Sequence, residues 1–198
     1  MAGPTLVIDL AEPVAPAVLR EFRALVVGLS CLFHEERPGA FHVNVPVERL
    51  GIADTGGERS TDEGLTAPAG ATPRREDSQR SFSLYLIGAG AGDESTFEAE
   101  HEDQSEVEAV LGFRPVQAVN VSAGRNRQVD HVATALLTAA VLDVVGGVCR
   151  AELADGQRAV VSGLPGLLGL ADDAWDTALI TAEFLRAWAE RPGFRLVK

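Results

Sequence analysis

Apolar residues recur every three or four positions along residues 126–145, and this spacing predicts the longest helix of the chain. Asn126 suits the N-cap, Asp130 suits the positive end of the helix dipole, and Gly146 can end the helix. The opposite side of this helix is only partly polar, so we expect a core helix with protein on most sides. The apolar face consists of Val129, Val132, Ala133, Leu136, Leu137, Ala140, Val141 and Val144.

The same spacing predicts a helix over residues 16–29, where Pro16 stands in the first turn. A last helix is predicted over residues 173–190, capped by Asp172 or Asp173 and ended by Pro192-Gly193. Its apolar stripe would consist of Trp175, Leu179, Ala182, Leu185 and Ala189. A shorter helix is expected to begin near Asp103 or Ser105 and to end at Gly112.

Runs of β-branched and aromatic residues between turn-forming residues predict the strands. Strands and helices do not alternate regularly, so a doubly wound parallel sheet is not expected. We predict a single α+β domain in which a mainly antiparallel sheet is packed by three to four helices. The predicted strands cover residues 5–10, 30–34, 40–47, 81–87, 115–122, 148–153, 158–162 and 194–197, while residues 164–170 have no clear pattern.

Residues 52–80 interrupt this organisation, because they are rich in Gly, Thr, Pro and charged residues and hold little to bury. Such a composition predicts a long mobile loop. The loop could be a disordered insertion or a segment that becomes ordered on a partner. We favour the insertion, since surface loops tolerate added residues.

The chain has 198 residues, enough for one sizeable core, and a net charge of −12. Nucleic-acid binding needs a basic face, so this charge argues against it. The N-terminal residues predict a strand and not a signal peptide, and no apolar run is typical of a membrane span, so we expect a cytoplasmic protein. Cys31 and Cys149 each lie in an apolar candidate strand, and we interpret both as buried thiols.

Residues 93–108 hold eight acidic residues among sixteen and no Lys or Arg. Carboxylates at this density repel one another unless solvent or a basic partner relieves the repulsion. The stretch is therefore either a solvated face or the docking surface for a basic protein. Its acidic residues are Asp93, Glu94, Glu98, Glu100, Glu102, Asp103, Glu106 and Glu108.

Catalytic, metal and cofactor motifs are weak. Gly88–Gly92 follow a predicted strand, as the glycines of nucleotide-binding turns do. Asp93 and Glu94 come next and would repel a phosphate, so we interpret these glycines as a plain turn. The four histidines lack metal-ligand spacing, and no cofactor, metal site or catalytic residue is predicted. Asp130, His131 and Cys149 could form the site of an enzyme of unknown reaction, but neighbouring helix residues point about 100° apart. A His131 bonded to nearby backbone is the simpler interpretation.

The segment VSAGRNRQVDHVATALLTAAVLDVVGGVCRAEL and the ending FLRAWAERPGFRLVK resemble an uncharacterised family of small actinobacterial proteins, a domain of unknown function. Similar helix-Gly-Gly-strand patterns occur in proteins proposed as immunity partners of polymorphic bacterial toxins. The resemblance implies an immunity protein, with no catalytic residues to transfer. Together with the acidic stretch, it predicts a non-enzymatic cytosolic protein that neutralises a basic toxin. An enzyme around Asp130, His131 and Cys149, and a small-ligand-binding or scaffold module, are the alternatives.

Overall fold

The computed structural model describes residues 3–53, 78–102 and 104–197. The chain is an α+β domain built on one eight-stranded sheet, in the order β2-β3-β4-β5-β1-β6-β8-β7, in which every neighbouring pair is antiparallel. The strands are β1 (Thr5–Leu10), β2 (Leu32–Arg37), β3 (Ala40–Pro46), β4 (Gln79–Gly88), β5 (Gln117–Ala123), β6 (Val148–Glu152), β7 (Leu167–Ala171) and β8 (Thr177–Ile180). The helices are α1 (Pro16–Leu29), η1 (Val47–Leu50), α2 (Glu94–Glu100), α3 (Ser105–Leu111), α4 (Gln128–Val145), α5 (Gln157–Val161) and α6 (Ala182–Ala189).

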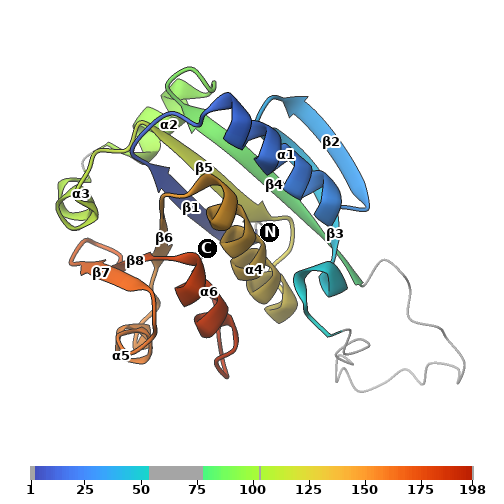
Figure 1. Ribbon diagram of the computed structural model, residues 1–198. Helices are drawn as coiled ribbons and strands as arrows, with labels where there is room; N and C mark the ends of the chain where they lie inside the picture. The colour runs from blue at the N-terminus through green and yellow to red at the C-terminus, as the bar shows by residue number, and fades with distance from the viewer. Residues whose placement is uncertain (1–2, 54–77, 103, 198) are drawn as a thin grey trace, which may run out of the picture.

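Helices α1, α4 and α6 lie side by side over one face of the sheet (Figure 1). Alternate strand residues such as Ile8, Leu84 and Val121 point to these helices and are fully buried. Burial of this face drives folding, because each buried Leu or Ile side chain contributes roughly 1.5–3 kcal/mol. We call this the helix-covered face and the opposite side the second face.

Helix α4 is the core helix that its sequence predicts. Leu137, Val141, Ala133, Ala135 and Ala139 are fully buried between the sheet and the neighbouring helices, whereas Leu136 and Ala140 of the predicted apolar face are half-buried. By length and composition α4 could span a membrane, but 56% of it is buried inside the protein, which is typical of the core helix of a folded domain. It begins at Gln128, with Arg127 and not Asn126 as N-cap, and the Asp130 carboxylate accepts a hydrogen bond from the Arg127 backbone N–H at 2.7 Å.

The second face carries the residues that alternate with the core positions. In β1, Val7 and Asp9 point away from the side that holds Leu6 and Ile8. Helices α2 and α3 cover part of this face, since Val107 of α3 packs with Leu179 of β8. The segment after α2 also reaches β1 near the middle of the sheet, where His101 contacts Asp9, 92 residues away in sequence.

Residues 158–162 are not the strand that their β-branched residues predict. They fall in α5, which begins after Gly156 in the left-handed conformation (φ 81°). The Gly-punctuated run that has no clear pattern in the sequence forms β7, the edge strand beside β8.

The predicted helix over 173–190 is also wrong in its first half. Asp176 adopts φ 51°, which ends the preceding turn, and Thr177–Ile180 then pair with both β6 and β7 as β8. Trp175 consequently lies in the β7–β8 loop, outside the helix stripe. The real helix α6 starts after Thr181, whose hydroxyl accepts a hydrogen bond from the Phe184 N–H.

Two further predictions differ from the structure. Residues 194–197 form no strand; Phe194 and Leu196 are buried in an extended tail, and Phe194 packs edge-on against Trp188. In the predicted mobile loop 52–80, residues 79 and 80 belong to β4 and Ile52 packs against the core. Most of that loop, residues 54–77, lies outside the described residues.

Candidate functional site

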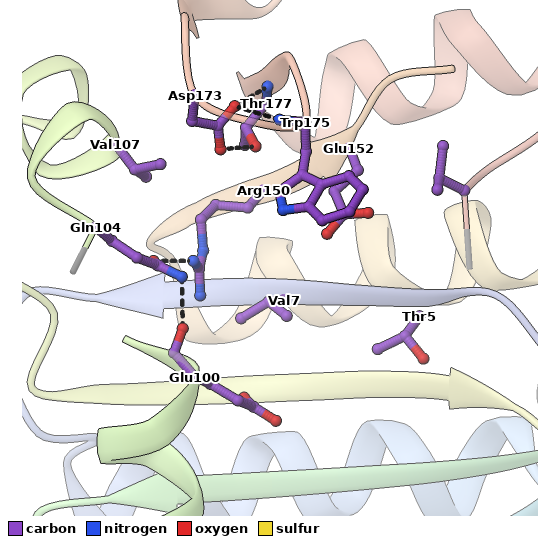
Figure 2. A pocket seen from close by; sticks show the side chains of 11 residues that line it. Thr5, Val7, Glu100, Gln104, Val107, Arg150, Glu152, Asp173, Trp175 and Thr177 are labelled. Carbon is purple, nitrogen blue, oxygen red and sulfur yellow. Dashed lines mark hydrogen bonds between the residues drawn. The ribbon is translucent and has the colours of Figure 1, made fainter. Parts of the chain in front are cut away.

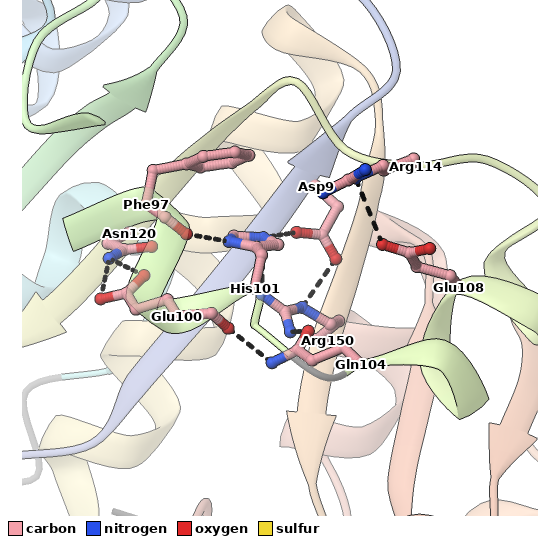
Figure 3. Close-up of polar contacts among 9 residues, drawn as sticks. All are labelled: Asp9, Phe97, Glu100, His101, Gln104, Glu108, Arg114, Asn120 and Arg150. Atoms are coloured by element: carbon pink, nitrogen blue, oxygen red, sulfur yellow. Dashed lines mark hydrogen bonds and ion pairs between the residues drawn. The ribbon is translucent and has the colours of Figure 1, made fainter. Parts of the chain in front are cut away.

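Asp9 is a carboxylate buried on the second face of the central strand β1, with none of its surface exposed. Arg150 of β6 places its Nε 2.6 Å from Asp9 Oδ2. His101, just after α2, places its Nε2 2.9 Å from Asp9 Oδ1 (Figure 3). A buried carboxylate is stable only with such partners, because an unpaired buried charge costs several kcal/mol.

This cluster fastens the segment between α2 and α3 to the sheet. His101 Nδ1 lies 2.8 Å from the backbone oxygen of Phe97, whose ring stacks on the imidazole. Arg150 donates a hydrogen bond to the Gln104 side chain, as Figure 3 shows. Both ring nitrogens of His101 and most of the Arg150 guanidinium are therefore engaged by protein groups.

The start of β6 is fixed by close backbone packing. Gly147 adopts φ 87°, and a Cβ at this position would lie 2.5 Å from the backbone oxygen of Asp9. Only glycine permits this approach. The Gly-Gly pair after α4 thus brings β6, and with it Arg150, against β1.

A cavity of about 270 Å³ opens beside the cluster on the second face. Glu100 and Gln104 form one side, from α2 and the segment after it, and Glu152 and Trp175 come from β6 and the β7–β8 loop (Figure 2). The cavity is lined by Thr5, Val7, Glu100, Gln104, Val107, Arg150, Glu152, Asp173, Trp175, Thr177 and Val197.

The lining of the cavity is acidic. It includes the carboxylates of Glu100, Glu152 and Asp173, whereas its single cationic residue, Arg150, is already paired with the buried Asp9. Burial, together with the nearby Asp173 carboxylate, raises the pKa of Glu152 above its ordinary value, although Arg150 opposes this. Among the described residues that line the cavity, the three carboxylates therefore have no cationic side chain that is free to neutralise them.

Two of these carboxylates are held in place by hydrogen bonds. The oxygens of Glu100 accept from Asn120 Nδ2 at 2.9 and 3.1 Å. Asp173 accepts from the Thr177 backbone N–H at 2.9 Å and from its hydroxyl at 2.7 Å. Glu152 has no hydrogen bond or ion pair among the described residues.

Trp175 is the most exposed large apolar residue among those described, with 64% of its surface accessible. The other tryptophan, Trp188, is 2% exposed and belongs to the core. An exposed tryptophan at the rim of a cavity is typical of binding sites, since its ring offers a large rigid surface.

The acidic stretch is distributed over α2, α3 and their connection. Asp93 forms an ion pair with Arg37, and Glu108 Oε1 lies 3.8 Å from Arg114 Nε, so arginines outside the stretch neutralise part of its charge. Glu100 lines the cavity. The exposed carboxylates without an ion pair among the described residues are Glu94, Glu98, Glu102 and Glu106, while Asp103 lies outside the described residues.

The rest of the second face is polar, and its β2 end carries one carboxylate, Glu36, 3.5 Å from His42 Nε2. His34, His42, Ser83, Ser122 and Thr5 occupy aligned positions across five neighbouring strands. His42 contacts the Ser83 hydroxyl through Nδ1 at 3.1 Å, and Ser122 shares a hydrogen bond with Thr5 at 2.9 Å. The concentration of carboxylates is thus a feature of the α2–α3 end of this face.

Asp130, His131 and Cys149 have separate structural contacts. Asp130 pairs with Arg80 (Oδ1 to Nε 3.3 Å), and His131 Nδ1 accepts a hydrogen bond from the Leu196 backbone N–H at 3.2 Å. Cys149 lies in β6, opposite Ile8 and Ile180. All three residues are buried, at most 1% exposed, and a bond from His131 to backbone is what the sequence favours.

The cysteines differ from one another. Cys149 is fully buried, and burial raises the pKa of its thiol far above the ordinary value, with Asp9 adding to the effect. Cys31 is exposed, so the prediction of a buried thiol is wrong for this residue. It lies just before the edge strand β2, where its Sγ donates to the Asn44 backbone oxygen at 3.3 Å.

No group of three or more His, Cys, Asp or Glu side chains could hold a metal ion within residues 3–53, 78–102 and 104–197. The site instead offers fixed carboxylates, an exposed indole and a cavity. These features favour binding of a cationic group.

Sequence reasoning identified Glu100 but missed Asp9, His101, Arg150, Glu152, Asp173 and Trp175 as members of one site. The available signal was Asp9 and Arg150 themselves, since Asp9 is the one charged residue of TLVIDL and Arg150 lies between the apolar residues Cys149 and Ala151 of VCRAE. Such residues need a partner when the strand is buried on both faces.

Comparison with known families decides the classification, because the model of a family of unknown function, DUF6368, matches residues 2–198. The chain belongs to this family. No curated protein and no solved structure matches the chain. Membership in DUF6368 confirms that the chain belongs to a family of unknown function, and the match extends well beyond the C-terminal half that carries the resemblance.

Proposed function

We propose that this DUF6368 chain is a non-enzymatic protein-binding protein that engages a basic protein through the α2–α3 end of its second face. The observation that carries the proposal is the cavity lined by Glu100, Glu152 and Asp173, whose one cation is already paired with Asp9. A partner that supplies positive charge would relieve this imbalance.

The carboxylates and the tryptophan would have different roles in binding. Exposed carboxylates on α2 and α3 would attract the partner and raise the association rate, as complementary charges do at protein interfaces. Trp175 would supply contact area at the centre, where a few residues contribute most of the affinity.

An immunity protein is the specific form of this function that we propose. Its support is the resemblance of the helix-Gly-Gly-strand pattern to proteins proposed as immunity partners of polymorphic bacterial toxins, together with a surface suited to a basic toxin such as a nuclease. The protein would then act in the cytoplasm, where it would bind the toxin and block it. A toxin gene next to the gene for this chain would support this form, whereas a metabolic operon would count against it.

The test compares two variants that each lose four carboxylates. In the first, Glu94, Glu98, Glu102 and Glu106 become Gln; in the control, Glu21, Glu48, Glu183 and Glu190 become Gln. All eight residues are exposed. The partner is first identified by photo-crosslinking from position 98 in host lysate, then purified, and its association rate is measured across salt concentrations.

The first variant should associate roughly tenfold more slowly than the native protein at low salt, and the control should stay close to native. The difference should shrink as salt rises, because the Debye length is about 8 Å at physiological ionic strength. An acidic partner, or equal rates for both variants at every salt concentration, would refute the proposed docking surface.

A further inference from the structure

We infer that the cavity beside Trp175 is the anchor site for one arginine side chain of the partner. The inference rests on the proposed function and adds to it the chemical group that the cavity binds. It depends on how the indole, the carboxylates and the paired Arg150 are arranged around the same space.

The size of the cavity suits one long side chain. Its volume of about 270 Å³ lies just below the range of roughly 300–1,000 Å³ that is typical of sites for drug-sized ligands and cofactors. It opens between α2 and the β7–β8 loop, so a side chain that projects from a docked protein can enter from solvent.

The charge of the cavity excludes an anion. The Nε of Arg150 forms an ion pair with Asp9, one Nη donates a hydrogen bond to Gln104, and the other Nη lies 3.0 Å from Nε2 of His101. An incoming phosphate or carboxylate would therefore meet a guanidinium that is already engaged and three carboxylates. A cation would instead meet the carboxylate of Glu152, which has no ion pair among the described residues and lines the cavity together with Glu100 and Asp173.

The indole distinguishes arginine from lysine. A guanidinium is planar and stacks on an aromatic ring while its N–H groups reach a carboxylate in a two-pronged fashion. Trp175 and Glu152 line the same cavity, so one guanidinium can contact both (Figure 2). An ammonium group has no flat face, and its stronger hydration opposes entry.

The test uses three blocked tripeptides, acetyl-Gly-X-Gly-amide, in which X is arginine, lysine or the neutral isostere citrulline. The ¹H–¹⁵N signal of the Trp175 indole N–H is followed as each peptide is added over the millimolar range. The Trp188 indole, 2% exposed, serves as the check that the fold is unchanged.

The arginine peptide should shift the Trp175 signal to saturation, the lysine peptide should bind more weakly, and citrulline should have no effect. Glu152→Gln should weaken arginine binding roughly two- to fivefold, as the loss of an exposed ion pair does. Glu183→Gln, which removes an exposed carboxylate on α6, should leave it unchanged. Trp175→Ala, followed through the Glu152 amide, should also cost roughly two- to fivefold.

Equal binding of citrulline would overturn a cation site, and equal or tighter binding of lysine would overturn the assignment to arginine. An unchanged affinity in Glu152→Gln would place the peptide elsewhere and also overturn the inference. Any of these results would refute the arginine pocket. If the variant that lacks the carboxylates of Glu94, Glu98, Glu102 and Glu106 still associates more slowly with the partner, the docking surface remains supported. If arginine binds as expected but the rate of partner association does not change with salt concentration, the arginine pocket is supported and the proposed electrostatic attraction of the partner is refuted.

Discussion

Arg150 Nε lies 2.6 Å from Asp9 Oδ2, and this ion pair joins two neighbouring strands whose residues are 141 positions apart in sequence. The Asp9 side chain is fully buried and that of Arg150 is 11% exposed. Removal of one charge would leave the other buried without its partner, which is far more costly than loss of an exposed pair.

Asp9→Asn should therefore lower the free energy of unfolding by about 3–5 kcal/mol. The matched control is Asp143→Asn, which breaks the exposed pair between Asp143 and Arg186 and should cost less than about 1 kcal/mol. Urea denaturation of the three proteins measures both values. Similar stabilities for the two variants would show that the Asp9 cluster does not fasten the α2–α3 segment.

Leu137 tests the core assignment of α4. Its side chain is fully buried, so Leu137→Ala should reduce stability by about 2–5 kcal/mol through lost burial and the resulting cavity. Leu168→Ala makes the same chemical change at a residue that is 57% exposed, and it should change stability by less than about 0.5 kcal/mol. Thermal or urea unfolding measures the difference, and equal effects would contradict the packing of α4.

The thiols should react very differently. A thiol reagent such as dithiobis-nitrobenzoate should label Cys31 in the native protein, because this residue is exposed. Cys149 should react only after denaturation, since burial raises its pKa and blocks access. Cys31→Ser should thus abolish labelling of the native protein. Fast reaction of that variant would mean that β6 opens readily.

Glu152 should titrate above the ordinary glutamate range, because burial and Asp173 raise its pKa. A carboxyl group with a raised folded-state pKa destabilises the folded state above that pKa. Its unfavourable contribution fades as pH falls through the folded value towards the unfolded one. A ¹³C NMR titration of the Glu152 carboxyl should show a raised midpoint, which falls when the arginine peptide is bound. If the titration midpoint of Glu152 stays the same when the peptide is added, the Glu152 carboxylate does not contact the bound arginine.

The helices and strands with local signals could be predicted from sequence. The apolar spacing of residues 16–29 and the β-branched run of residues 5–10 determine α1 and β1 with the bounds observed. In contrast, RAVVS has strand-forming residues but forms part of α5, and the stripe from Trp175 to Ala189 joins a loop, a strand and a helix. There, long-range pairing of β8 with β6 and β7 overrides local preference.

The candidate site was less predictable because its members come from distant segments. Glu100 stands out in the sequence because of the acidic residues around it, but nothing local joins it to Glu152 or Trp175. Only the strand order, with β6 beside β1 and β8 beside β6, brings these residues to one cavity.

The position of β1 has a consequence for how the protein folds. This first strand pairs with β5 and β6, so it has no neighbour in the sheet until the chain has been made as far as Ala123, and its second neighbour is complete only at Glu152. Pairings over such separations carry a large loop-closure entropy and form slowly. The sheet therefore closes only after most of the chain has been made, and until then the apolar residues of β1 remain open to aggregation.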